Sequence, residues 1–375
     1  MRFAIKKWAD VLQIISGRNQ KEVLDPTGSY PIYGSGGIMG YANQYLCEAG
    51  TTIVGRKGTI DNPIFVNERF WNVDTAFGVS PGEQLNPRYL YFFCRHFNFK
   101  QLDKSTTIPS LAKRDLLSIE MPVPPLVEQK RIVEKIEELF SELDSGVETL
   151  KMIKSKVDRY KYSVIDSVLP SENQKSIADC IKEMGQGWSP KCERVNVVDD
   201  DNWAVIKTTA VQPCKFLFDE NKALPSSLAP RERHEIMAGD ILITRAGPKS
   251  RCGVCCMVRK TKRRLLNCDK VYRLRLHEDI VLPQYLEYVL NSPAFIQEIN
   301  LCKTGGNDSG LNLTQDRFLS IRIPVPSIKK QEEIVSEIES RRSVCDSIEK
   351  TVDAALQQAD ALRQSILKKA FEGKL

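Results

Sequence analysis

The sequence has no apolar run approaching the roughly 20 residues that a membrane-spanning helix needs. The segment from Met1 to Asp10 also lacks the apolar stretch of a secretion signal, so we expect a cytoplasmic protein. Histidine is scarce, and His96, His234 and His277 are dispersed without the pattern of a catalytic triad. These absences argue against a membrane protein and against a triad-type hydrolase.

Motifs for nucleotide and cofactor binding are also missing. Residues 247–250 (GPKS) resemble the end of a phosphate-binding loop, but proline replaces the glycine before the lysine. Residues 34–40 miss the G-x-G-x-x-G pattern by one position, and no Asn-Pro-Pro-Tyr element typical of amino-methyltransferases is present. A nuclease centre of Asp219, Glu220 and Lys222 is an alternative, although such clusters are common in charged loops. We therefore predict no catalytic residue and no cofactor in this chain.

The 11 cysteines are scattered and odd in number, which favours free thiols over disulfides. Cys252, Cys255 and Cys256, together with Cys268, include a Cys-x-x-Cys pair of the kind that binds zinc. However, residues 254–258 alternate as in a strand that buries small thiols, and no second Cys-x-x-Cys pair follows. The sequence therefore predicts buried thiols and no metal site.

A tandem repeat is the most informative feature present. Residues 118–137 read SIEMPVPPLVEQKRIVEKIE and residues 320–339 read SIRIPVPSIKKQEEIVSEIE, with ten of twenty positions identical at an offset of 202. Weaker matches lie upstream at offsets of 169 (residues 9–12), 189 (49–58) and 195 (72–74). Offsets that rise in order indicate one ancestral unit whose second copy gained loop insertions.

The 375 residues are enough for two globular domains and further elements. We predict a first domain at residues 1–121, a first spacer helix at 122–170, a second domain at 171–323 and a second spacer helix at 324–375. The net charge of +6 fits a nucleic-acid partner without requiring one.

The spacer helices follow from proline and from apolar periodicity. Prolines at 122, 124 and 125 end the first domain, and no proline interrupts Val127 to Leu169. Apolar residues then recur at steps of three and four, which predicts a coiled-coil seam in each copy. The first seam comprises Leu143, Val147, Leu150, Ile153, Val157, Tyr160, Val164 and Val168, and the second comprises Cys345, Ile348, Val352, Ala355, Ala359, Leu362, Ile366 and Ala370.

Neither narrow seam is expected to be stable alone, so we predict that the two helices pack antiparallel against each other. A straight helix over residues 127–169 would be about 64 Å long at ~1.5 Å per residue. Such a spacer suits duplex DNA, which presents sites at a regular helical repeat. The alternative is that the helices only hold together a compact two-domain enzyme.

The duplicated S-I-x-x-P-V-P…Q…I-V…I-E segment, each copy opening a long helix, resembles the specificity subunits of type I restriction–modification enzymes. The C-terminal residues 361–375 and the segment at residues 30–37 (YPIYGSGG) resemble the same family. Lys330 departs from the pattern, because the first copy has Glu128 at this position, and we expect only a local change at the helix start.

This resemblance implies an α+β fold in which two mixed α/β target-recognition domains are separated by two long antiparallel coiled-coil helices. Each domain would read one half of a bipartite site in double-stranded DNA, and the helices would dock two methyltransferase subunits. Restriction–translocation subunits would join through them. S-adenosylmethionine, ATP and Mg²⁺ would belong to those partners.

Candidate DNA contacts lie at matching places in the two copies. Arg56 and Arg245 end short apolar strands before glycine turns, where arginine can bind a phosphate or guanine. An internal ion pair is the equal alternative. Polar loops and one basic run are further candidates for phosphate contact, with ordinary surface loops or a solvated hairpin tip as the alternatives. These further candidates are Lys57, Lys104, Ser105, Thr106, Lys249, Ser250, Arg251, Arg259, Lys260, Lys262, Arg263, Lys303, Thr304 and Asn307.

Three other functions compete with this reading. A related DNA-defence assembly could use a similar subunit with two DNA-binding domains. The neighbouring genes would identify that assembly. A stand-alone DNA-modifying enzyme would need a cofactor site, which the motifs do not supply. A coiled-coil scaffold would show no salt-sensitive affinity for DNA, whereas a DNA reader should.

Overall fold

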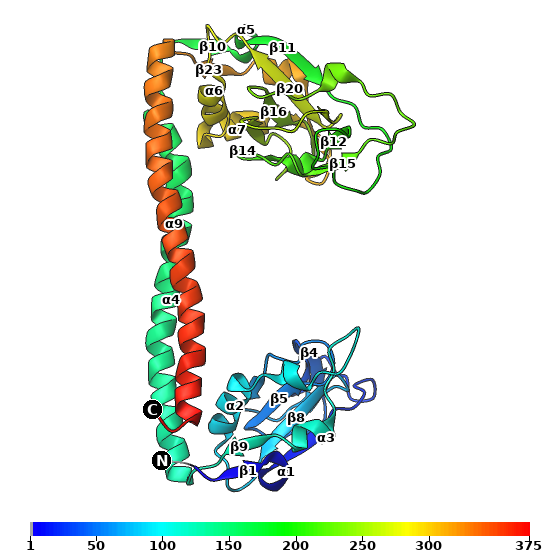
Figure 1. The fold of residues 1–375 in the computed structure, drawn as a ribbon, viewed down its shortest axis with the longest axis vertical. Coiled ribbons are helices and arrows are strands. Elements are labelled where there is room, and N and C mark those ends of the chain that lie inside the picture. Colours follow the sequence, from blue (N-terminus) through cyan, green and yellow to red (C-terminus); the bar gives the residue numbers. More distant parts are fainter. Residues whose placement is uncertain (1–2) are drawn as a thin grey trace. The chain divides into compact units, whose positions relative to one another are not determined.

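A computed structural model of the protein describes residues 3–375, so Met1 and Arg2, which begin the predicted first domain, lie outside the described residues. The chain divides into two compact units. Unit 1 comprises Met1–Lys151 and Val352–Leu375, and unit 2 comprises Met152–Thr351. Each unit therefore contains one sheet-bearing domain and a part of each long helix (Figure 1).

The two long helices are α4 (Leu126–Val168) and α9 (Ile328–Phe371). The two spacer helices were predicted at residues 122–170 and 324–375, and each observed helix is shorter at both ends. Both helices begin shortly after the repeated prolines, because proline is accepted at a helix start but not in a helix interior.

Unit 1 combines two larger sheets with short helices. Its four-stranded sheet has the order β2-β8-β5-β6, its three-stranded sheet has the order β4-β3-β7, and β1 pairs with β9. The elements in chain order are β1 (Ile5–Lys7), α1 (Trp8–Val11), β2 (Leu12–Ser16), β3 (Tyr30–Gly34), β4 (Gly37–Ala42), β5 (Thr51–Gly55), β6 (Ile64–Val66), β7 (Trp71–Asn72), β8 (Ala76–Pro81), α2 (Pro87–His96), η1 (Phe99–Leu102), α3 (Lys113–Leu117) and β9 (Glu120–Pro122).

Unit 2 has the same plan with additional pieces. Its main sheets have the orders β11-β20-β16-β18 and β15-β12-β19, and β10 pairs with β23. The elements are β10 (Gln174–Ser176), α5 (Ile177–Cys180), β11 (Ile181–Gln186), β12 (Ala204–Ile206), η2 (Thr208–Ala210), β13 (Val211–Gln212), β14 (Lys215–Phe216), β15 (Asn221–Ala223), η3 (Glu232–His234), β16 (Ile241–Thr244), β17 (Ala246–Gly247), β18 (Cys255–Met257), β19 (Leu265–Leu266), β20 (Val271–Leu276), α6 (Pro283–Leu290), α7 (Pro293–Cys302), β21 (Lys303–Thr304), β22 (Leu311–Leu313), α8 (Gln315–Leu319) and β23 (Arg322–Pro324).

The strand pairings show that the two domains are copies of one fold. The four-stranded sheets are antiparallel throughout, with β8 and β20 in corresponding places. The three-stranded sheets share an unusual feature, because β3 and β12 each pair antiparallel with one neighbour and parallel with the other. The fold class is therefore α+β, as the family resemblance implied, and the domain is duplicated, as the rising offsets predicted.

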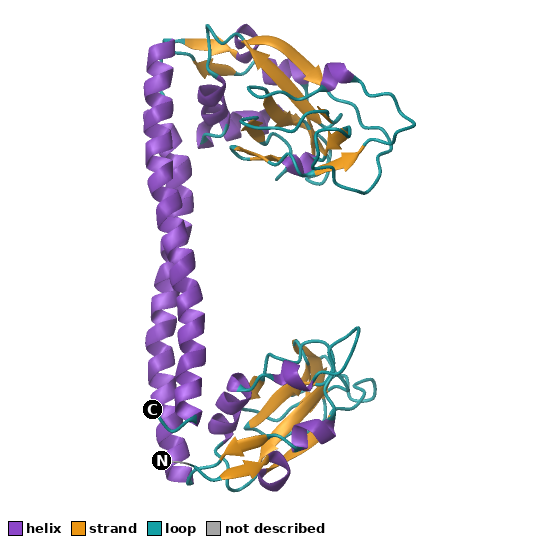
Figure 2. Cartoon of the chain, in the orientation of Figure 1, coloured by secondary structure: helices purple, strands orange, loops and turns teal. Residues whose placement is uncertain are grey.

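The second copy is longer mainly in its loops. In unit 1 only Ser35 and Gly36 separate β3 from β4, whereas residues 207–220 separate β12 from β15 and carry η2, β13 and β14. Figure 2 draws these longer connections of unit 2 in teal. Loop insertions explain why the sequence offset rises along the repeat.

A buried glutamine anchors each long helix to its domain by the same hydrogen bonds. Gln129 Nε2 donates to the carbonyls of Gln84 and Pro124, both at 2.8 Å, and its Oε1 accepts from the Asn86 amide at 2.8 Å. Gln331 repeats this pattern with Ile280, Pro326 and Leu282 at 2.8–2.9 Å. Both side chains are fully buried, so the repeated glutamine is a structural anchor.

The departure at Lys330 is local, as expected. Glu128 pairs with Arg131 at 2.8 Å in the first copy, and Lys330 pairs with Glu333 at 3.0 Å in the second. The same pair of helix positions therefore carries an ion pair with its charges exchanged. Both pairs are exposed, so water screens them and neither is a strong stabilising contact.

Within each unit, α4 and α9 run antiparallel. In unit 1, Arg131 donates to the Leu375 carbonyl at 3.0 Å, and Asp144 further along α4 pairs with Arg363, which precedes Leu375. In unit 2, Lys161 pairs with Asp346 and Glu349, both at 2.7 Å. In unit 1 the residue numbers of the contacts rise along α4 while they fall along α9. The two helices therefore run antiparallel, as predicted.

The seam itself differs from the prediction at four positions. Ile153, Tyr160, Ile348 and Leu362 are 37%, 48%, 38% and 49% exposed, so their assignment to a buried stripe is wrong. The predicted positions with buried or half-buried side chains are Leu143, Val147, Leu150, Val157, Val164, Val168, Cys345, Val352, Ala355, Ala359, Ile366 and Ala370.

The inward positions follow a different spacing. In the first helix, two steps of three follow one another from Val147 to Ile153, and because three residues advance a helix by about 300°, Ile153 lies about 120° from the position of Val147. In the second helix the predicted positions alternate three and four, but the inward positions follow the other phase, which begins at Cys345 with a step of four. The inward positions include Lys161, Glu349 and Arg363, whose side chains are only 14%, 23% and 21% exposed. Long charged side chains thus occupy inward positions, where each forms an ion pair with the other helix.

Aromatic packing in unit 1 leads to a prediction on pH. The His96 ring stacks on Phe371 at a centroid distance of 5.4 Å, and burial lowers the pKa of His96 below its ordinary value. The unfolded state then binds more protons, so stability is fully present above the ordinary value of 6.5 and is lost as pH falls toward the lower, folded value. We expect His96→Gln to flatten this acid-side loss in unit 1, measured by urea unfolding against pH with hydrogen exchange as readout. Unit 2 serves as the internal control, and an unchanged pH profile of unit 1 would contradict the assignment.

Candidate nucleic-acid interface

Arg56 and Arg245 occupy equivalent places at the ends of β5 and β16. Arg56 Nη1 donates to the Asp74 carbonyl at 3.2 Å, and Arg245 Nη1 donates to the Asp269 carbonyl at 3.2 Å. The guanidinium carbons lie 5.9 Å from the ring centroid of Phe77 and 5.6 Å from that of Tyr272. Among residues 3–375 neither arginine has a carboxylate partner, so a carbonyl and an aromatic ring hold each side chain in place of the ion pair considered above.

A cleft of about 370 Å³ opens beside Arg56 in unit 1. Its lining residues are Ser16, Arg56, Lys57, Phe77, Ser110, Leu111, Ala112 and Lys113. Lys57 is exposed, and the segment that holds it pairs with Ser110. Lys113 donates through Nζ to the Ile14 carbonyl at 2.7 Å and was not among the predicted residues. Lys113 aligns with Gln315 in the second copy. Because the repeat has no basic residue at the second position, the sequence comparison did not indicate Lys113 as a candidate.

The loop with Lys104, Ser105 and Thr106 borders this region. Asp103 orders the loop by accepting from the amides of Ser105 and Ser110 at 3.0 and 3.1 Å. Lys104 pairs with Asp115 at 2.9 Å, and Thr106 is exposed. Part of the positive charge of this loop is therefore compensated within unit 1.

Unit 2 brings three predicted residues together. Lys249, Ser250 and Lys303 line one cleft of about 300 Å³. Lys303 Nζ donates to the Lys249 carbonyl at 3.3 Å and to Asn300 Oδ1 at 2.5 Å, and burial lowers the pKa of Lys303. Nearby, the Thr304 hydroxyl donates to the Asn312 carbonyl at 3.2 Å.

Asn307 and Lys249 belong to the same loop cluster. Asn307 Oδ1 accepts from the Ser309 hydroxyl at 2.8 Å. Lys249 Nζ lies 3.6 Å from Asp308 Oδ2, and the Lys249 amide donates to the Asp308 carbonyl at 2.8 Å. The segments that contain these residues are thus tied to each other by backbone contacts.

The basic run at residues 259–264 joins β18 to β19, as expected, but much of its charge points inward. Arg259 pairs with the fully buried carboxylate of Glu287 at 2.6 Å. Lys262 donates to the carbonyls of Asn202 and Arg263 at 2.9 and 2.8 Å, and burial lowers its pKa. Lys260 and Arg263 are exposed.

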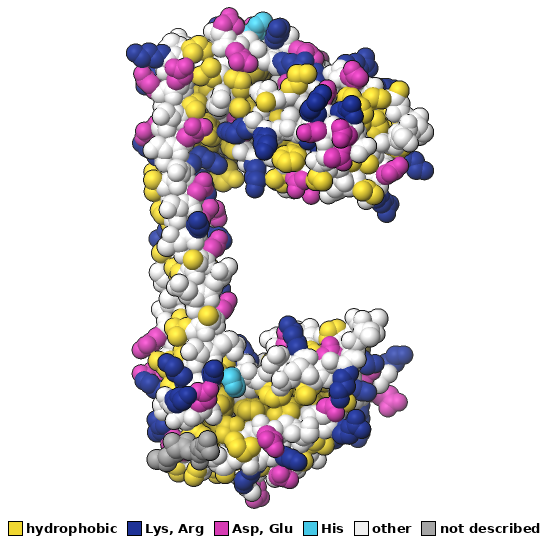
Figure 3. All heavy atoms as spheres, in the orientation of Figure 1, with side chains coloured by type: hydrophobic (Ala, Val, Ile, Leu, Met, Phe, Trp, Pro, Cys, Tyr) yellow, Lys and Arg dark blue, Asp and Glu magenta, His cyan; other side chains and the backbone are white. Residues whose placement is uncertain are grey.

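Arg251 is likewise engaged inside unit 2. Its guanidinium donates to the carbonyls of Thr208 and Val211, both at 2.7 Å, and to Gln212 Oε1 at 3.1 Å. On the face drawn in Figure 3, Lys and Arg side chains are interspersed with Asp and Glu over both units.

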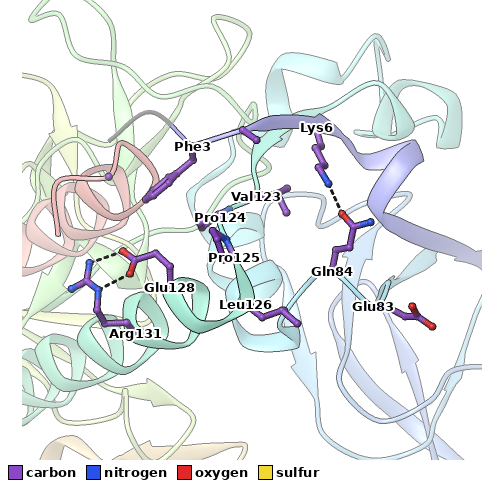
Figure 4. Close-up of a pocket in the computed structure, with 12 residues that line it drawn as sticks. Phe3, Lys6, Glu83, Gln84, Val123, Pro124, Pro125, Leu126, Glu128 and Arg131 are labelled. Carbon is purple, nitrogen blue, oxygen red and sulfur yellow. Dashed lines mark hydrogen bonds and ion pairs between the residues drawn. The ribbon is translucent and has the colours of Figure 1, made fainter.

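A further hollow of about 790 Å³ lies in unit 1 away from these residues. Figure 4 shows that Val123, Pro124, Pro125 and Leu126 form part of its wall beside the Glu128–Arg131 ion pair. Within residues 3–375, no group of three or more His, Cys, Asp or Glu side chains could hold a metal ion. None of the helices in this described part has the length and hydropathy to cross a membrane.

Comparison with known proteins places these features in a family. Residues 2–154 match the model of the type I restriction modification DNA specificity domain. The specificity subunit of the type I restriction enzyme EcoEI of Escherichia coli is 38% identical over 195 residues, which cover 51% of this chain and 33% of that protein. The EcoKI specificity subunit of Escherichia coli K12 is 29% identical over 330 residues, 80% of this chain and 69% of that protein.

Solved structures share the fold at low sequence identity. A chain from a study of the assembly and conformational transition of a type I restriction–modification system has a TM-score of 0.73 at 16% identity, covering 100% of this chain and 98% of that one. The HsdS subunit from Thermoanaerobacter tengcongensis has a TM-score of 0.54 at 17% identity, with 100% and 97% coverage. The family model and the related sequences agree: residues 2–154 match a type I restriction modification DNA specificity domain, and the chain over most of its length is similar to the specificity subunits of type I restriction enzymes.

Proposed function

We propose that this chain is the non-catalytic DNA-reading subunit of a type I restriction–modification assembly. The domain of each unit binds one half of a bipartite duplex site. Methyltransferase subunits dock on the long helices, restriction–translocation subunits join through them, and the S-adenosylmethionine, ATP and Mg²⁺ chemistry resides in those partners.

The observation that carries this proposal is the duplication of one fold with different surface loops. The four-stranded sheets and the sheets β4-β3-β7 and β15-β12-β19 repeat strand for strand, and the guanidinium groups of Arg56 and Arg245 make equivalent hydrogen bonds. Around them the side chains differ, because Lys57, Ser110 and Lys113 align with Ala246, Asn312 and Gln315. Two domains with the same fold but different surface side chains suit two half-sites of different sequence.

Exposed apolar side chains on the helices support the docking of protein partners. In unit 2, Tyr160, Val344 and Ile348 are 48%, 58% and 38% exposed. A helix face with several large exposed apolar residues is typical of a protein–protein contact. Tyr160 and Ile348, which were predicted to be buried in the seam but are exposed, are therefore proposed to lie at this contact.

The test is to co-express the chain with the methyltransferase encoded beside it, in a host without adenine methylation, and to map modified bases by single-molecule sequencing. We expect one split motif of two short defined halves around an unspecified gap of constant length. Methylation at a continuous motif would refute reading by two separate domains.

Salt titration separates DNA reading from a scaffold role. The affinity for a duplex with the mapped motif should fall with salt at a log–log slope of about −0.9 per phosphate contact. A scaffold would have no such affinity. Absence of methylation by a methyltransferase shown to bind S-adenosylmethionine would favour another DNA-defence assembly.

A further inference from the structure

The β3–β4 hairpin of unit 1 carries large apolar side chains that nothing in the unit covers. Ile38, Met39 and Tyr41 are 56%, 58% and 46% exposed. All three lie on β4, which is an edge strand of its sheet. Single exposed apolar residues are ordinary, but three within four residues of one strand mark a contact surface.

A β-bulge creates this surface. Ile32 pairs with Gly40 and Tyr33 pairs with Ile38, so Met39 has no partner. Regular pairing would put Ile38 on the same face as the buried Ile32. The extra residue moves Ile38 to the opposite face, because a shift of one residue reverses the side-chain direction in a strand. The pairing of the strands thus places Ile38 on the face of Tyr33, where 56% of Ile38 is exposed.

The tip of the hairpin is open and lies next to the cationic cleft. A side chain added at Gly36 or Gly37 would meet no neighbour within 4 Å, so the backbone there can approach a ligand closely. A Cβ at Gly58 would lie 3.6 Å from Ser35 Oγ, which places the tip beside the loop that holds the exposed Lys57.

On its other side the hairpin adjoins a second exposed cation. β3 pairs with β7, and the Arg18 amide donates to the Asn72 carbonyl of β7 at 3.0 Å. β7 is separated from β4 by β3, so Arg18 adjoins the opposite edge of this sheet, and Lys57 is the exposed cation beside the hairpin tip. An apolar edge strand with an exposed lysine near its turn suits a ligand with an apolar feature beside negative charge.

We propose that the β3–β4 hairpin enters the DNA major groove of the half-site bound by unit 1 and that Ile38 and Met39 contact thymine C5-methyl groups there. The major groove admits a two-stranded ribbon, and the thymine methyl is the apolar group displayed in it. A phosphate beside the groove would meet Lys57. This inference rests on the proposed function and deepens it, because it names what one domain reads.

Unit 2 has no equivalent apolar strand. Its β15 reads Asn221-Lys222-Ala223 and pairs with β12 without a bulge. The two-residue turn of unit 1 is replaced by residues 207–220. Contacts of this kind with thymine C5-methyl groups should therefore occur only in the half-site bound by unit 1.

The test uses the full chain with its methyltransferase and a duplex that carries the motif mapped by sequencing. Each thymine is replaced in turn by deoxyuridine, which removes only the C5 methyl. We expect affinity to fall about 4-fold per contacted methyl at one or two positions of a single half-site. In Ile38→Ala or Met39→Ala the same deoxyuridine should have no further effect, because the partner of the methyl is already absent.

Two control variants separate the possible causes. Ile5 is 59% exposed on β1, in a different sheet, so Ile5→Ala should keep the full sensitivity to deoxyuridine. Lys57→Ala should weaken binding to all sequences alike and reduce the salt slope by about 1.

Two results would overturn the inference while leaving the proposed function intact. One is a split motif in which no thymine methyl affects the affinity of the unaltered protein. The other is a loss of methyltransferase co-purification in the Ile38 and Met39 variants, which would make the hairpin a protein contact. If the unaltered complex recognises no split motif, the proposed function itself fails and the inference with it.

Discussion

Arg259→Ala is expected to lower the free energy of unfolding of unit 2 by about 3 kcal/mol. The side chain of Glu287 is 0% exposed, and both of its oxygens accept from Arg259. Removing the guanidinium leaves a buried carboxylate whose only remaining donor among residues 3–375 is the Met257 amide, at 2.6 Å. Hydrogen exchange during urea unfolding would measure this loss in unit 2 separately from unit 1.

Arg263 provides a matched control in the same basic run. It is exposed, and Arg263→Ala removes the same charge with an expected change below about 0.5 kcal/mol. Adding Glu287→Gln to Arg259→Ala should recover part of the stability, because the neutral amide is less costly to bury than a lone carboxylate. If Arg259→Ala instead kept full stability and lost DNA affinity, Arg259 would be a phosphate contact rather than an internal one.

Gln129→Leu and Gln331→Leu are each expected to destabilise one unit by about 2–3 kcal/mol. Leucine has a similar size but satisfies none of the three backbone groups that each glutamine bonds. Loss of exchange protection should begin around residues 84–86 and the start of α4 for Gln129→Leu. For Gln331→Leu it should begin around residues 280–282 and the start of α9.

The repeat supplies the control for this pair. Each variant should leave the other unit unchanged, and Gln101→Leu, at an exposed site in unit 1, should leave both unchanged. Gln129→Glu should also destabilise unit 1, because a carboxylate would face the carbonyls of Gln84 and Pro124 without a donor. Equal stability of Gln129→Leu and Gln101→Leu would show that the buried glutamine does not anchor the helix.

Features that depend on residues near each other in sequence were predictable. The prolines before residues 126 and 328 and the proline-free stretches after them predicted both long helices, which begin within a few residues of these prolines. The matches at offsets of 169 to 202 predicted a duplicated domain because equivalent residues form equivalent strands. Arg56 and Arg245 were paired correctly because each follows a short apolar strand.

The direction of charged side chains was not predictable in this way. The run at residues 259–264 has the composition of a phosphate-binding hairpin, yet Arg259 meets Glu287 of α6. Lys262 likewise meets the Asn202 carbonyl, 60 positions upstream. Lys113 joins the cleft of Arg56 from a segment with no repeated signal. Only the packing of segments distant in sequence decides which cations are internally satisfied.

The sequence by itself determined the duplication, the two long helices and the family, because each of these depends on order, spacing and composition along the chain. The tertiary structure decided the rest. It selected Lys161, Glu349 and Arg363 for the inward helix positions, since ion pairs with the other helix stabilise them there. It also placed Ile38 on the face of Tyr33 through a bulge, because strand register is set by pairing between strands and not by the alternation of one strand.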